Sequence, residues 1–190
     1  YEIAECIVGS EMCIRDRVIG GGPAGMKATA VAASRGHSVK LIEATSKLGG
    51  QVNLAERLPG RSEFGGIKTN LKNMLRTQDV EIKLNTEASL QLIREEAPEV
   101  IILATGGKSF EPKIEGKDSA HVVTAWQLLE GKANVGSRVV IADWRCDWVG
   151  LGVAELLARQ GCHVRLACNG MVPGQTINQT VRDNWLGTLH

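Results

Sequence analysis

A glycine-rich turn at Gly20–Gly25, with the sequence GGGPAG, carries the residues best suited to binding a phosphate group. Gly20 allows the chain to turn sharply, and Gly22 allows the backbone to approach a pyrophosphate without an intervening Cβ. Gly25 allows the following helix to pack closely on the preceding strand, and the free N–H groups at the helix start attract phosphate oxygens. The turn therefore predicts a dinucleotide-binding βαβ unit.

An acidic residue, Glu43, stands 18 residues after Gly25, at the end of the next expected strand. A carboxylate at this position can accept hydrogen bonds from both ribose hydroxyls of an adenosine. It would also repel a 2′-phosphate. The nucleotide expected here is therefore an ADP group without a 2′-phosphate.

Two further small-residue segments follow the turn. In Leu48-Gly49-Gly50-Gln51 the glycine pair lets the chain pass close to a second part of the ligand, and Gln51 offers both a donor and an acceptor. Ala104-Thr105-Gly106-Gly107 ends an apolar strand at the carboxyl edge, where ligands bind in parallel sheets. The three motifs together are far more specific than any one of them.

Alternating strand and helix patterns position these motifs. Glycine stops, apolar runs and helical spacing predict helices at 24–35, 62–75, 90–96 and 126–129, and strands at 38–43, 80–84 and 100–103. Ser62 is the expected cap of the second helix, and 44–61 is expected to be a loop.

A second unit repeats the plan, with a strand at 138–142, a helix at 149–160 and a strand at 162–167. Bulky Trp144 and Trp148 stand where glycines would be needed for a pyrophosphate, and no acid ends the last strand. This pattern disfavours NAD(P) binding. The chain stops soon after that strand, so we expect the second unit to be truncated, because two strands alone do not make a stable sheet.

The residues before the turn fit a buried strand poorly. Arg15, Asp16 and Arg17 precede Val18, and unpaired buried charges cost on the order of several kcal/mol each. The segment 11–17, EMCIRDR, also resembles a translated sequencing-adapter read. We hypothesise that 1–17 is not native and that the natural chain resumes at Val18. A genuine but unusual N-terminal arm is the alternative.

Composition excludes several classes of protein. The net charge of +1 indicates neither a nucleic-acid footprint nor a polybasic membrane patch, and no apolar run is long enough to span a membrane. The five cysteines form no C-x-x-C pair, so reduced thiols in a cytoplasmic protein are expected rather than a metal site. The four histidines form no set with metal or triad spacing.

Several motifs together resemble a known family. The glycine turn with Glu43, LGGQVNLA at Leu48–Ala55, PGRSEFGG at Pro59–Gly66, ATGG at Ala104–Gly107 and TAWQLLEGKA at Thr124–Ala133 carry the resemblance. It is to the C-terminal region of NADH:flavin oxidoreductases of the 2,4-dienoyl-CoA reductase and trimethylamine dehydrogenase type, and it covers Val18 to His190. The segment Asp147–Ile177 looks more like the amine- or N-methyl-oxidising branch.

The resemblance implies an α/β, Rossmann-like fold of the pyridine nucleotide-disulfide oxidoreductase type. It implies two incomplete nucleotide-binding domains, at 18–125 and 126–190. Carried over by position, the residues facing pyrophosphate would be Gly20, Gly22, Pro23, Ala24 and Gly25. Glu43 would hold the ribose, Gly50 and Gln51 would lie near the pyrophosphate-to-flavin stretch, backbone at Ala88 near the adenine, and Thr105 and Gly106 along the inner edge.

The cofactor implied is FAD, with ADP as the alternative, while FMN and a 4Fe-4S cluster would lie only upstream of Val18. The function expected is that of an FAD- or ADP-binding electron-transfer region of an oxidoreductase acting on an amine, N-methyl or enoyl substrate. The isolated chain is expected to be inactive, and an electron-transfer flavoprotein is a possible acceptor. Two alternatives stay open: a non-catalytic ADP-binding structural module, and an NAD-dependent dehydrogenase without flavin.

Overall fold

The computed structural model describes residues 14–189, which form two compact units. The first holds the described residues up to Val52 together with Gly66–Gly106. The second holds Asn53–Gly65 and the described residues from Gly107 onward. Residues 1–13 of the segment hypothesised to be non-native lie outside the described part of the chain.

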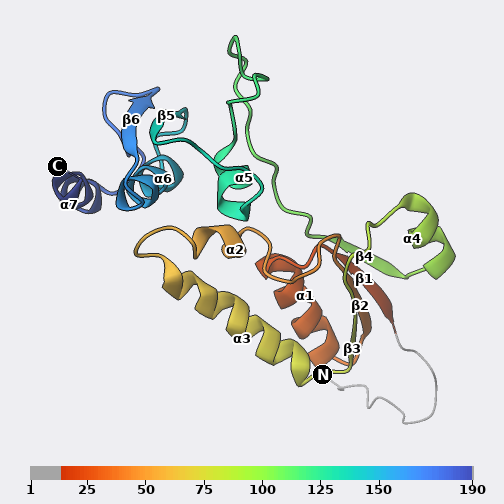
Figure 1. Ribbon diagram of the computed structural model, residues 1–190. Coiled ribbons are helices and arrows are strands. Elements are labelled where there is room, and N and C mark those ends of the chain that lie inside the picture. Colours follow the sequence, from red (N-terminus) through yellow and green to blue (C-terminus); the bar gives the residue numbers. More distant parts are fainter. Residues whose placement is uncertain (1–13, 190) are drawn as a thin grey trace. The chain divides into compact units, whose positions relative to one another are not determined.

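The first unit is a parallel four-stranded sheet in the order β3-β2-β1-β4 (Figure 1). Helices α1 and α3 lie on one side of this sheet and α4 lies on the other (Figure 1). The strands are β1 (Arg15–Ile19), β2 (Ser38–Ile42), β3 (Val80–Lys83) and β4 (Val100–Leu103), and the helices are α1 (Pro23–Ser34), α3 (Gly65–Arg76) and α4 (Leu90–Glu96). The predicted Rossmann-like α/β fold is confirmed.

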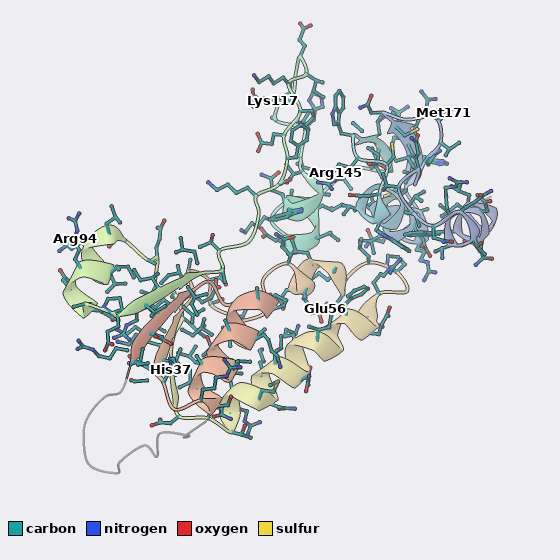
Figure 2. The ribbon with its side chains drawn as sticks, turned by 180° about the vertical axis from the view of Figure 1, so that it is seen from behind. His37, Glu56, Arg94, Lys117, Arg145 and Met171 are labelled. Atoms are coloured by element: carbon teal, nitrogen blue, oxygen red, sulfur yellow. The ribbon has the colours of Figure 1, made fainter. Side chains whose placement is uncertain are left out.

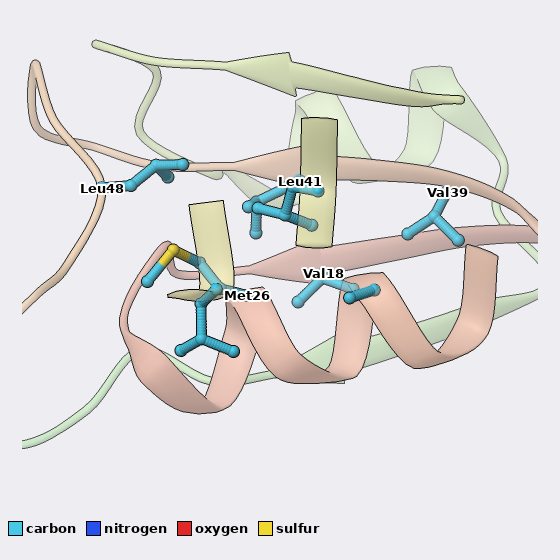
Figure 3. Packing of buried hydrophobic residues seen from close by; sticks show 8 residues of the cluster. Val18, Met26, Val39, Leu41 and Leu48 are labelled. Atoms are coloured by element: carbon cyan, nitrogen blue, oxygen red, sulfur yellow. The ribbon is translucent and has the colours of Figure 1, made fainter. Parts of the chain in front are cut away.

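Alternation along the strands creates the apolar face of this sheet. Val18, Val39 and Leu41 all point to the side of α1, where Met26 packs against them (Figure 3). Val18, Leu41 and Met26 are fully buried. Small residues along α1, such as Ala30, let this helix lie close to the strands, which fixes the helix start relative to the strand ends.

The opposite face of the sheet carries a charged cluster around Glu96 of α4. Its carboxylate accepts hydrogen bonds from Lys40 at 2.9 Å and Lys83 at 3.1 Å, and it also pairs with Arg17. Burial alone would raise the pKa of Glu96, but the three hydrogen bonds outweigh it and lower the pKa to about 2. One carboxylate, whose side chain is 11% exposed, therefore joins strands β1, β2 and β3 to α4.

The two buried charges in β1 have partners in the folded unit. Arg17 pairs with Glu96, and Asp16 lies 2.7 Å from the Nδ1 atom of His37. His37, labelled in Figure 2, follows α1. One oxygen of Asp16 is nevertheless buried without a hydrogen-bond partner. The expected cost of burying these charges is therefore largely offset, and the hypothesis that 1–17 is not native stays a prediction.

The second unit is built on two parallel strands, β5 (Arg138–Asp143) and β6 (His163–Cys168), with α6 (Trp148–Arg159) beside them (Figure 1). Its buried core contains Leu58, Leu129, Val153 and Leu157. Leu129 comes from α5 (Ala125–Glu130), which begins with a capping box on Thr124. The domain boundaries proposed from the sequence, 18–125 and 126–190, stay a prediction.

Three elements differ from the sequence-based expectations. The loop at 44–61 contains a short helix, α2 (Val52–Ala55), and α7 (Gln179–Thr188) lies in a segment for which no element was predicted. Ser62 does not directly precede a helix, because a 3-10 turn η1 (Ser62–Phe64) comes first and α3 begins at Gly65. Among residues 14–189, no helix is both long and apolar enough to cross a membrane.

The Glu96 cluster makes a pH-dependent contribution to stability. Because the folded pKa is depressed from 4.5 to about 2, the contribution is fully present above pH 4.5 and is lost as the pH falls toward 2. Glu96→Gln should lower the free energy of unfolding by about 2–3 kcal/mol at neutral pH. In urea titrations this difference from wild type should shrink by about half near pH 3. A difference that stays constant from pH 7 to pH 3 would contradict the assignment.

Candidate nucleotide site

The glycine turn is held at the carboxyl ends of two neighbouring strands. The N–H of Gly20 donates to the carbonyl of Ile42 at 2.8 Å, which ties the turn to the end of β2. The N–H of Ala104 donates to the carbonyl of Ile19 at 2.8 Å, which ties the end of β4 to the end of β1. The turn and the Ala104–Gly106 segment therefore meet at one edge of the sheet.

The contacts of the turn leave no room for side chains at two of its glycines. A Cβ on Gly25 would overlap the carbonyl oxygen of Gly20, and a Cβ on Gly20 would overlap the carbonyl of Ala104. Gly20 also has a φ of +105°, a conformation that other residues rarely adopt. The roles predicted for Gly20 and Gly25, a sharp turn and close helix packing, correspond to these contacts.

The start of α1 is open to an anion. Gly22 stands at the N-cap position, no side chain caps this end, and the first turn contains no acidic residue. Pro23 has no N–H to satisfy, and Ala24 and Gly25 follow in the first turn. Because the first amides of any helix lack intrahelical acceptors, this end presents N–H groups and a positive dipole.

Glu43 lies beside the turn and is already engaged by the protein. One carboxylate oxygen accepts the N–H of Gly21 at 2.6 Å, and the other accepts the N–H and the hydroxyl of Thr45, both at 2.7 Å. Glu43 is buried. The carboxylate therefore anchors the turn as well as standing where a ribose is expected.

The hydroxyl of Thr45 can donate its hydrogen bond to an acceptor other than Glu43. Its hydroxyl oxygen lies 2.7 Å from Glu43 and 3.0 Å from the carbonyl of Lys47, but a hydroxyl has one proton to donate. Donation to Lys47 would leave lone pairs of Glu43 for a ribose hydroxyl. The contacts of Glu43 with Thr45 and with the N–H of Gly21 were not predicted from the sequence. The one sequence feature that indicates such a contact is a hydroxyl residue two positions after the acid.

The second glycine loop approaches the turn closely. A Cβ on Gly50 would lie 3.0 Å from the Cα of Gly22, and the N–H of Gly49 donates to the carbonyl of Gly21 at 2.9 Å. The amide nitrogen of Gln51 lies 3.6 Å from the position of a Cβ on Gly106. The structure therefore brings Gly50, Gln51 and Gly106 to the same edge as the turn.

Two predicted residues are placed less directly. Thr105 contacts the turn through its Cα, which lies 3.0 Å from the position of a Cβ on Gly20. Ala88 follows Thr86, whose N–H donates to the carbonyl of Glu43 at 3.0 Å. The segment of Ala88 thus begins near the end of β2, and its contact with an adenine stays a prediction.

The corresponding end of the second unit is closed by carboxylates. Asp147 caps α6 by accepting the N–H of Val149 at 2.9 Å, and Asp143 accepts the N–H of Cys146 at 2.9 Å. A Cβ on Gly150 would overlap the Asp143 side chain. Two acidic side chains therefore occupy the helix start, where a pyrophosphate would need the amide groups.

The sequence of the chain is similar to those of known flavoprotein oxidoreductases and matches one family model. The sequence matches the family model described as pyridine nucleotide-disulphide oxidoreductase over residues 17–182. It is 34% identical over 179 residues to the N,N-dimethylglycine/sarcosine dehydrogenase of Chromohalobacter salexigens, covering 91% of this chain and 26% of that protein. It is 38% identical over 164 residues to the bilirubin reductase of Mediterraneibacter gnavus, covering 86% of this chain and 25% of that protein.

Two solved structures superimpose on most of this chain. A 2-naphthoyl-CoA reductase complex superimposes with a TM-score of 0.85 at 33% identity, over 92% of this chain and 26% of that one. The histamine dehydrogenase of Rhizobium sp. 4-9 superimposes with a TM-score of 0.82 at 24% identity, over 95% of this chain and 30% of that one. The chain thus spans about a quarter of the length of the first relatives it matches, 26% and 25% for the two enzymes above.

The close contact at Gly25 can be tested by adding one carbon atom. Gly25→Ala should destabilise the first unit by about 3 kcal/mol, because the new Cβ would overlap the Gly20 carbonyl oxygen. Gly66→Ala is the matched control, since Gly66 lies in α3 with no atom within 4 Å of the added Cβ. It should be neutral or stabilising by up to about 1 kcal/mol. Equal stabilities of the two variants in urea unfolding would contradict the contact.

Proposed function

Because the chain belongs to the pyridine nucleotide-disulphide oxidoreductase family, we propose that its first unit binds FAD within a flavin-dependent oxidoreductase. The observation that carries the proposal is the uncapped start of α1, framed by glycines and placed beside the buried Glu43. An uncapped helix end with no acidic residue is suited to a pyrophosphate, and a neighbouring carboxylate is suited to a ribose.

The residues present fit the ADP half of the cofactor. Gly22 and Gly50 approach each other so closely that a side chain on Gly50 would fill the space beside the helix start. Pro23, Ala24 and Gly25 would face the pyrophosphate, and Glu43 would accept a ribose hydroxyl. Gln51, Thr105 and Gly106 would follow the cofactor toward its flavin end. When bound, FAD would supply the electron-carrying chemistry, while this chain binds and orients it.

The names of the relatives suggest a class of substrate for the whole protein. The relatives include a dimethylglycine/sarcosine dehydrogenase and a 2-naphthoyl-CoA reductase, so we propose that the whole protein acts on an amine, N-methyl or enoyl substrate. This reaction would use FMN and a 4Fe-4S cluster held upstream of this chain. The proposed location is the cytoplasm, which the free thiols of Cys146, Cys162 and Cys168 support.

The carboxylates at the start of α6 bear on the choice of electron acceptor. Asp143 and Asp147 occupy the start of α6, and their negative charge opposes a pyrophosphate there. Burial, the cause that dominates, raises the pKa of Asp143, but Asp147 still places a carboxylate at the helix end. We therefore propose a protein acceptor, such as an electron-transfer flavoprotein, rather than NAD(P) at this unit.

A structural role for ADP is the second candidate. The residues of the turn would bind the pyrophosphate and the adenosine, which FAD and ADP share. The same site could therefore hold an ADP that only stabilises the unit. The Gly49-Gly50-Gln51 loop and the Ala104-Thr105-Gly106 segment, which would follow a cofactor toward a flavin, argue against an NAD-dependent dehydrogenase without flavin.

Identification of the bound nucleotide tests the proposal. The full-length protein that carries this chain should show flavin absorption, and denaturation should release FAD, separated from any FMN by chromatography. Gly25→Ala should lose FAD and retain FMN, while Gly66→Ala should keep both. Release of ADP without FAD would favour the structural role. Release of NAD alone would overturn both candidates.

The carboxylate at Glu43 should set the preference for an unphosphorylated ribose. Glu43→Gln removes the negative charge and one acceptor, so ADP should bind about tenfold more weakly to the cofactor-free protein. Binding of 2′-phosphorylated ADP should weaken less, because the variant no longer repels the 2′-phosphate. The ratio between the dissociation constants of the two ligands should therefore become smaller. The exposed Glu99→Gln serves as the charge-matched control. An unchanged ratio of the two dissociation constants in Glu43→Gln would argue against ribose recognition by this carboxylate.

A further inference from the structure

Thr45 lies beside Glu43, at the edge of the first sheet that carries the glycine turn. It follows the end of β2 and bonds to the Glu43 carboxylate through both its N–H and its hydroxyl. Thr45 is exposed, whereas Glu43 is only 9% exposed. A ligand that approaches from solvent can therefore reach the Thr45 side chain more readily than the carboxylate.

Glu43 has little hydrogen-bonding capacity left for a ligand. The N–H of Gly21 donates to one carboxylate oxygen at 2.6 Å, and the N–H and the hydroxyl of Thr45 donate to the other, both at 2.7 Å. Because an ionised carboxylate offers roughly four lone-pair positions, about one position is left. The ribose of an adenosine, however, carries a pair of hydroxyls that both need acceptors.

The hydroxyl oxygen of Thr45 is a further acceptor beside that carboxylate. A hydroxyl has one proton to donate and also has lone pairs that accept. The Thr45 proton can be donated within the protein, either to Glu43 at 2.7 Å or to the carbonyl of Lys47 at 3.0 Å. With either acceptor, the oxygen of Thr45 can still accept an O–H from a ligand.

Backbone hydrogen bonds fix the position of this hydroxyl. The N–H of Asn85 donates to the carbonyl of Thr45, and the N–H of Thr86 donates to the carbonyl of Glu43, both at 3.0 Å. The segment after β2 is thereby bound to the segment after β3. Threonine is also β-branched, which restricts its χ1 angle. The acceptor oxygen of Thr45 is therefore held 2.7 Å from a carboxylate oxygen of Glu43.

We propose that Thr45 is a second ribose-binding residue: one ribose hydroxyl donates to Glu43, and the other donates to the hydroxyl oxygen of Thr45. Two neighbouring acceptor atoms match two hydroxyls on neighbouring carbons of the sugar. Without the Thr45 oxygen, one ribose hydroxyl would give up its hydrogen bond to water and find no acceptor in the site. This assignment rests on the proposed binding of FAD or ADP by the first unit, and it adds a residue that selects for an intact ribose.

Calorimetric titration of the cofactor-depleted full-length protein with ADP, 2′-deoxy-ADP and 3′-deoxy-ADP tests the proposal. Thr45→Val replaces the hydroxyl by a methyl group and keeps the backbone N–H that binds Glu43. ADP should bind about tenfold more weakly to this variant than to wild type. For one of the two deoxy nucleotides, wild type and Thr45→Val should bind with equal affinity, because the hydroxyl that Thr45 accepts is already missing.

Three further variants serve as comparisons. Thr45→Ser keeps the hydroxyl, so its affinity for ADP should stay within about twofold of wild type. Ser46→Ala removes the neighbouring exposed hydroxyl and should leave the affinity for ADP unchanged. The loss of affinity in Glu43→Gln should shrink with the other deoxy nucleotide, because the two residues accept different hydroxyls.

Failure of ribose binding by Thr45 can be told apart from failure of ADP binding. Wild type that does not bind ADP would overturn the proposed function and the role of Thr45 with it. If wild type binds ADP but no more tightly than Thr45→Val does, the role of Thr45 alone is overturned. The same holds if Thr45→Ser binds as weakly as Thr45→Val. If the losses in Thr45→Val and Glu43→Gln shrink with the same deoxy nucleotide, Thr45 only orients the carboxylate, and the proposal is again overturned.

Discussion

The close approach of two backbone segments at Gly20 and Gly25 is the constraint on which the first unit depends. The carbonyl of Gly20 lies against the Cα of Gly25, so α1 begins directly at the end of β1. The same turn rests on Ala104 at the end of β4 and is bound to Glu43 through the N–H of Gly21. Without this approach, the open helix start, the carboxylate and the glycine loop at Gly50 would not share one edge of the sheet.

The two βαβ units show how one plan supports opposite electrostatics. The start of α1 has no side-chain cap and no acid in its first turn, so its amides are open to an anion. The start of α6 is capped by Asp147 and crowded by Asp143. The start of one helix is thus left open to an anion in the first unit, while the corresponding helix start in the second unit is occupied by the protein's own carboxylates. This contrast explains why we assign the nucleotide to one unit alone.

Local patterns in the sequence predicted most of the fold, and they predicted which glycines lie together at one edge of the first sheet. Glycine positions and strand ends located Gly20, Gly25, Gly50 and Gly106 because backbone geometry restricts these positions to small residues. The engagement of Glu43 by Thr45 could not be predicted, since it depends on how the chain turns after β2. The pairing of Arg17 with Glu96 could not be predicted either, because 79 residues separate the partners. That pairing is why charged residues in β1 are compatible with a buried strand.

We propose that an ADP group binds at the start of α1 and not at the start of α6. Hydrogen–deuterium exchange of the cofactor-depleted full-length protein, with and without ADP, tests it most directly. We expect ADP to slow exchange in peptides that cover the glycine turn and the first turn of α1 (Pro23–Ser34), and to leave peptides that cover Asp143 to Gly150 unchanged. Protection at Asp143 to Gly150 with none at the glycine turn would contradict it.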